Sequence, residues 1–151
     1  MLFEEASLRM RRYRGDKELG GGATQADMTE AEAALGTTFP ESYKAFLREF
    51  GWGGVGSWEL FGVGRSVPEY LNLVRMTGME RTVAHPHIPR ALIPIMNDGF
   101  GNHYCLATAS LNKGECPVVF WDHEKDAKQE PKVVSPQFDL WLLDLLRESG
   151  I

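Results

Sequence analysis

Apolar residues recur three or four positions apart in several stretches of the chain, and this spacing places them on one face of a helix. The pattern predicts helices over residues 2–12, 40–50, 68–76 and 136–146. Within the third of these helices, the side chains expected to point inward are Tyr70, Leu71, Val74 and Met76.

Residues 29–36 predict a further, shorter helix. Thr29 and Glu32 have the spacing of a capping box, in which the hydroxyl and the carboxylate each bind a free backbone amide of the first turn. Gly36 then ends the helix, because glycine readily adopts the left-handed conformation common after helix C-termini.

Alternation of polar and apolar residues from Ser57 to Leu60 predicts a half-buried strand over residues 57–61. The turn 97–102 connects two strands tightly, so we expect a positive φ at Gly99 or Gly101. Hairpin-linked strands between helices predict an α+β fold, with a largely antiparallel central sheet and helices at the N- and C-terminal ends. The later strands are expected at residues 93–96, 103–107, 117–121 and 132–134.

Residues 1–151 are expected to form a single domain, since this length is typical of one domain and the chain has no internal repeat. Residues 1–27 supply an N-terminal helix and then a flexible connection that contains Gly20, Gly21 and Gly22. No apolar stretch is long enough to cross a membrane, and the N-terminus lacks the basic region of a signal peptide. We therefore expect a cytoplasmic protein without a membrane partner.

Charge is distributed unevenly along the chain. The 16 Lys and Arg residues face 21 Asp and Glu residues, which gives a formal net charge of −5. Residues 27–59 have six acids and two bases and residues 115–151 have eight and four, so each segment has a net charge of −4. Such a balance is poorly suited to general nucleic-acid binding. Either the two segments form one acidic face that attracts a basic partner, or they form an ordinary solvated surface.

Motifs for catalysis and cofactor binding are weak. Residues 51–56 fit the pattern G-x-G-x-x-G, but a predicted helix precedes them and a strand follows, the reverse of a dinucleotide-binding loop. We therefore expect a plain helix-to-strand loop there. The histidines lack zinc-site spacing, no serine has a nucleophile-elbow motif, and Cys105 and Cys116 are typical of buried thiols. The sequence predicts no catalytic residue, no metal and no cofactor.

Four segments together resemble a known family. Residues 35–47 read LGTTFPESYKAFL, and residues 93–106 combine IPI with the turn and strand NDGFGNHYCL. VVFWDHE follows at 118–124, and an F-x-x-W-L-x-x-L-L pattern closes the chain at 138–146. Their order and spacing over residues 28–148 resemble the SUKH superfamily, which contains the fungal cell-wall-synthesis regulator and many bacterial immunity proteins. The resemblance implies an α+β domain, no catalysis and a protein partner, in bacteria usually a polymorphic toxin and commonly a nuclease.

An acidic domain suits such a partner, because a nuclease active site is basic in order to hold phosphates. The alternative is a regulatory or scaffold domain that binds an endogenous protein. In both cases we expect a monomer or a weak homodimer.

Trp52 is expected to be exposed, because the glycines around it offer little cover, and an exposed tryptophan beside acids is typical of a binding hot spot. The candidate partner-binding residues are Trp52, Trp58, Glu59, Asp98, Asp122, Glu124 and Asp126.

Overall fold

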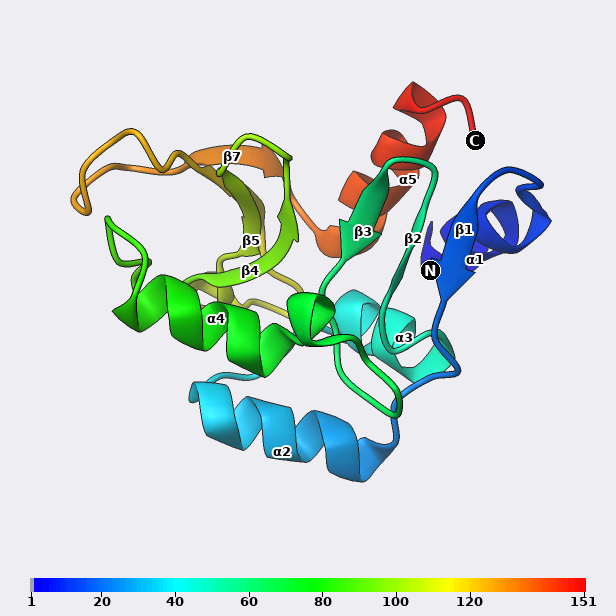
Figure 1. The fold of residues 1–151 in the computed structure, drawn as a ribbon, viewed down its shortest axis with the longest axis horizontal. Coiled ribbons are helices and arrows are strands. Elements are labelled where there is room, and N and C mark those ends of the chain that lie inside the picture. Colours follow the sequence, from blue (N-terminus) through cyan, green and yellow to red (C-terminus); the bar gives the residue numbers. More distant parts are fainter. Residues whose placement is uncertain (1) are drawn as a thin grey trace.

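A computed structural model describes residues 2–151 and arranges them as an α+β fold (Figure 1). The helices are α1 (Leu2–Arg12), α2 (Gln25–Leu35), α3 (Glu41–Glu49), α4 (Leu73–Thr82) and α5 (Phe138–Glu148), with short 3-10 helices η1 (Glu69–Leu71) and η2 (Thr108–Ser110). The strands are β1 (Lys17–Leu19), β2 (Gly53–Val55), β3 (Trp58–Leu60), β4 (Ile93–Asn97), β5 (His103–Leu106), β6 (Val118–Trp121) and β7 (Lys132–Ser135).

The strands form two antiparallel sheets, one in the order β1-β2-β3 and one in the order β4-β5-β6-β7. The sheets meet just after β3, where the amide of Phe61 donates to the carbonyl of Ile95 over 2.8 Å. Helices α1 and α5 pack together on one side of the molecule, and α2 packs against α4 on another (Figure 1). The α+β class, the antiparallel pairing and the terminal helices predicted from the sequence are confirmed.

Two strands lie where the sequence predicts loops. Strand β1 is part of the supposedly flexible connection, and β2 lies inside the glycine-rich motif at 51–56, so the expected plain loop is wrong there. Neither strand shows alternating hydrophobicity, because each has only three residues and β2 contains two glycines. A Cβ atom on Gly54 would lie only 2.2 Å from the carbonyl oxygen of Trp58, so glycine allows the strands to approach this closely.

Helix α2 begins one turn before the predicted start. Its N-cap is Thr24, whose hydroxyl accepts from the amide of Asp27 over 3.1 Å, while Asp27 accepts from the amide of Thr24 over 2.9 Å. The capping box predicted at Thr29 is therefore wrong. The equivalent box Thr-x-x-Asp at residues 24–27 starts the helix earlier, so Thr29 lies inside it. The predicted stop is confirmed, since Gly36 is left-handed with a φ of 65°.

Aromatic side chains from α3 and α5 form the centre of the core. The rings of Tyr43, Phe46 and Phe138 all contact one another: the Phe46 centroid lies 5.9 Å from each of the other two, which lie 5.1 Å apart. The hydroxyl of the buried Tyr43 donates to the carbonyl of Phe61 over 2.8 Å, and burial raises the pKa of this phenol well above its usual value. This bond attaches the helical layer to the point where the two sheets meet.

Candidate partner-binding surface

The turn between β4 and β5 is held in shape by the side chain of Asp98. One of its carboxylate oxygens accepts from the amides of Phe100 over 2.8 Å and Asn102 over 3.1 Å. The other accepts from the Asn102 side chain over 2.9 Å. Partial burial alone would raise the pKa of Asp98, but the hydrogen bonds from Asn102 and Phe100 outweigh burial and lower it. The turn therefore presents an ionised carboxylate at neutral pH.

Asn102 also attaches this turn to the loop between β6 and β7. Its carboxamide oxygen accepts from the amide of His123 over 3.1 Å and lies 2.7 Å from Nδ1 of the same histidine. The two loops carry the candidate acids Asp98, Asp122, Glu124 and Asp126. The structure thus joins two acid-bearing loops that are separated in the sequence by a complete strand pair.

The predicted positive φ is found at both glycines of the turn, with 88° at Gly99 and 93° at Gly101. We expect Gly99→Val to cost about 1–3 kcal/mol of stability, because a β-branched residue is strained at positive φ. Gly101→Val is expected to cost more, since even a Cβ atom there would lie 3.0 Å from the His123 ring, whereas nothing lies within 4 Å at Gly99. Denaturation midpoints of the two variants check this order, and equal midpoints would contradict it.

A groove of about 410 Å³ lies between the end of β3, η1 and the β4–β5 turn. Trp58, Glu59 and Asp98 all contribute to its lining, so three of the predicted residues come together here. The hydroxyl of Tyr70 donates to a carboxylate oxygen of Glu59 over 3.1 Å. Hydrogen bonding to Glu59, and then the negative charge of that carboxylate, raise the pKa of the Tyr70 phenol. Glu59 is exposed and Trp58 is buried.

Trp52 does not reach the surface. Only 7% of this residue is exposed, so the expected exposure is wrong. Its cover comes from a distant part of the chain, because Gly20 packs so closely that a Cβ atom there would lie 2.5 Å from the indole nitrogen. The glycine-rich connection therefore packs over this side chain and shields it from solvent.

Sequence reasoning missed the aromatic residues that are exposed beside the groove. Phe100 is 81% exposed at the tip of the β4–β5 turn, and Tyr70 is 53% exposed, against the expectation that it points inward. Tyr70 belongs to η1 rather than to α4, so helical spacing does not describe its direction. The available signal was the position of Phe100 between two glycines in a tight turn, where it has no neighbours to pack against.

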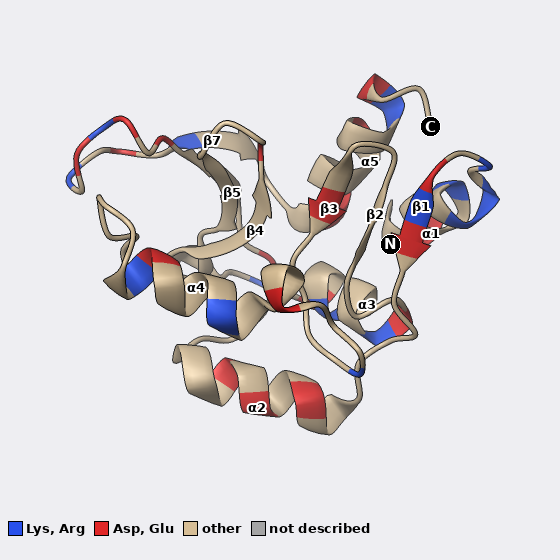
Figure 2. Ribbon diagram, in the orientation of Figure 1, with Lys and Arg blue, Asp and Glu red and all other residues tan. Residues whose placement is uncertain are grey.

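The acids of the β6–β7 loop have local structural roles as well. Asp122 accepts from the amide of Glu124 over 2.9 Å, and Asp126 accepts from the amide of Lys128 over 2.8 Å. Lysines alternate with acids along this loop, whereas the acids of α2 lie on a separate part of the molecule (Figure 2). The acidic segments 27–59 and 115–151 therefore do not merge completely into one acidic face.

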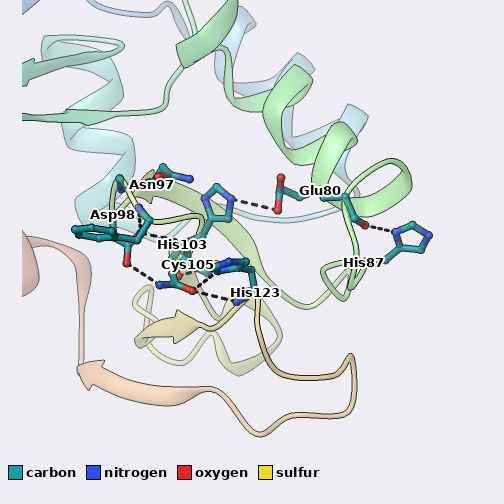
Figure 3. Close-up of polar contacts among 11 residues, drawn as sticks. Glu80, His87, Asn97, Asp98, His103, Cys105 and His123 are labelled. Carbon is teal, nitrogen blue, oxygen red and sulfur yellow. Dashed lines mark hydrogen bonds and ion pairs between the residues drawn. The ribbon is translucent and has the colours of Figure 1, made fainter.

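Other chemistry-bearing side chains are buried. His103 is 3% exposed, and its Nε2 lies 3.2 Å from a carboxylate oxygen of Glu80 (Figure 3). Cys105 and Cys116 are free thiols, and burial raises the pKa of Cys116 to about 12, so this thiol is protonated at neutral pH. Within residues 2–151, no group of three or more His, Cys, Asp or Glu side chains is placed to hold a metal ion.

With this surface in view, comparison with known proteins identifies the family. The sequence profile described as SMI1-KNR4 cell-wall, of the SUKH group, matches residues 5–147. The chain belongs to the SUKH family. The fold is also similar to that in the crystal structure of a protein from Pseudomonas syringae pv. tomato, with 22% sequence identity and a TM-score of 0.61. That match covers 80% of this chain and 83% of the Pseudomonas protein.

Among the described residues of this SUKH chain, no helix is both long enough and apolar enough to cross a membrane.

Proposed function

We propose that this SUKH protein is a non-catalytic immunity protein that binds and neutralises a toxin domain with a basic surface. The observation that carries the proposal is the groove, which is lined by the exposed Tyr70 and the acids Glu59 and Asp98. Next to it, the tip of the β4–β5 turn carries the exposed Phe100. Membership of the SUKH family supports a role in protein–protein interaction. The acids of the neighbouring β6–β7 loop extend the proposed surface beyond the groove.

Charge and aromatic area have different roles in such an interface. Acids at the rim mainly accelerate association, because their field steers a basic partner and is screened by salt. An aromatic side chain that becomes buried on binding mainly slows dissociation. Phe100 is the best candidate for this second role, since it has 81% of its surface free to be covered.

We expect Phe100→Ala to weaken binding of the toxin by about 2 kcal/mol or more, mainly through faster dissociation. Val83→Ala is the matched control, because Val83 is an exposed apolar residue at the end of α4 with 65% of its surface accessible. The measurement is binding kinetics with a toxin domain encoded beside this protein. Equal dissociation rates for the two variants would exclude Phe100 as an anchor.

Neutralising Glu59, Asp98, Asp122, Glu124 and Asp126 together is expected to slow association and to flatten its dependence on salt. An association rate that changes neither with salt concentration nor on neutralising these acids would contradict the electrostatic mechanism. Capture of an endogenous protein, with no protection against the toxin, would favour the regulatory or scaffold function instead.

A further inference from the structure

The groove beside β3 has negative charge without a balancing positive charge. Its lining includes the acids Glu59 and Asp98 and contains no lysine or arginine. Neither acid takes part in an ion pair within residues 2–151, although Glu5, Glu41 and Glu49 elsewhere do. The groove therefore offers carboxylates whose cationic partner is not supplied by this part of the chain.

The carboxylates are held in place by neutral donors. Glu59 accepts from the Tyr70 hydroxyl over 3.1 Å, and Asp98 accepts from the side chain of Asn102 over 2.9 Å. Neutral donors fix the position of an acid while leaving its negative charge uncompensated. An incoming cation would thus meet acids that are already oriented, with little loss of side-chain freedom on binding.

The remaining lining suits a flat, weakly hydrated cation. It includes the exposed Tyr70, the buried Trp58 and Phe61, and two methionines. Aromatic faces attract cations, and a guanidinium both stacks on such faces and donates up to five hydrogen bonds in a planar fork. An ammonium is a more strongly hydrated point charge, so this combination of rings and carboxylates favours arginine over lysine.

We propose that this groove is the site for an arginine side chain of the protein partner, with its guanidinium beside Glu59 and Asp98 and its aliphatic part on the apolar lining. This inference rests on the proposed protein-binding function and specifies the chemistry of one contact within it. It also gives a role to the two acids that lie in a groove whose other lining residues are mostly apolar.

The proposal is tested with Nα-acetyl-arginine methylamide as the probe, titrated into the complete protein. The indole N–H signal of Trp58 in two-dimensional NMR spectra reports binding. The matched probes are the lysine analogue and the citrulline analogue, which keeps the shape of arginine but has no charge. We expect saturable shifts with the arginine probe, weaker shifts with lysine and none with citrulline.

Glu59→Gln should weaken the arginine probe by at least about threefold, a modest factor because Glu59 is exposed to solvent. The control is Glu4→Gln, which removes the same charge from an exposed position on α1. Because the carboxamide introduced by Glu59→Gln can still accept from Tyr70, the variant should fold normally, and thermal melting checks this. Equal affinity for arginine and citrulline, or equal weakening by Glu4→Gln, would overturn the proposal.

The arginine site and the immunity function can be refuted separately. A toxin that binds with unchanged affinity to Glu59→Gln would refute the arginine site and leave the immunity function in place. Specific arginine binding without any protection against a toxin would support the site and count against the immunity function.

Discussion

Gly62→Ala is expected to destabilise the protein by about 3 kcal/mol or more. Gly62 lies where three segments cross: its amide donates to the carbonyl of Leu71 over 2.9 Å, and its carbonyl accepts from the amide of Leu73 over 2.8 Å. A Cβ atom on Gly62 would lie 1.7 Å from the carbonyl oxygen of Gly51, which itself accepts from the amide of Val63. The clash is with the backbone of Gly51 and Trp52, so no side-chain rotation relieves it.

The matched control is Gly78→Ala in the middle of α4. A Cβ atom there meets nothing within 4 Å, and alanine is the better helix former, so we expect a gain of up to about 1 kcal/mol. Equilibrium unfolding in urea measures both changes. If the two variants shifted the free energy of unfolding in the same direction, the close approach of Gly62 to Gly51 would be wrong.

Phe46→Ala is expected to cost about 3–5 kcal/mol of stability, because it leaves a cavity among rings that cannot close it. Phe46 is fully buried, and its ring lies 6.0 Å from that of Phe50 as well as 5.9 Å from those of Tyr43 and Phe138. A loss of this size is a large fraction of the stability of an ordinary domain.

Phe100→Ala is the control with the same chemical change at an 81% exposed position, and its stability should change by less than about 0.5 kcal/mol. Phe46→Leu, expected to cost less than about 1.5 kcal/mol, keeps the measurement possible if Phe46→Ala does not fold. Thermal or urea unfolding compares the three. A loss at Phe100 as large as that at Phe46 would contradict the assignment of core and surface.

Substitutions in the core and substitutions on the proposed surface should have different effects. Substitutions on the proposed surface should change partner binding without changing the fold, because Phe100 and Glu59 contribute little to packing. Substitutions at Asp98 are different, since this residue lines the groove and its carboxylate also holds the β4–β5 turn. Loss of binding in an Asp98 variant therefore needs a stability measurement beside it.

The sequence by itself determined the helices and the larger sheet of this SUKH protein. Helical spacing placed α1, α3 and α5 closely, Gly36 placed the end of α2, and glycine turns between apolar runs predicted the strand pairs of β4, β5 and β6. Helix α4 was predicted only in part, because the stretch 68–76 combines η1 with the first turn of α4. These signals are local: an amphipathic face, a cap or a tight turn depends on residues only a few positions apart. The resemblance to the SUKH family also came from the sequence alone.

Only the tertiary structure decided which side chains are buried and which residues form the groove. Trp52 is covered by Gly20 and Tyr70 projects outward from η1, although local pattern suggested the reverse for both. The groove joins Glu59 to Asp98 across almost forty positions of sequence. Whether a side chain is buried depends on segments that are distant in the chain. The periodicity of one segment does not show which other segment will pack against it.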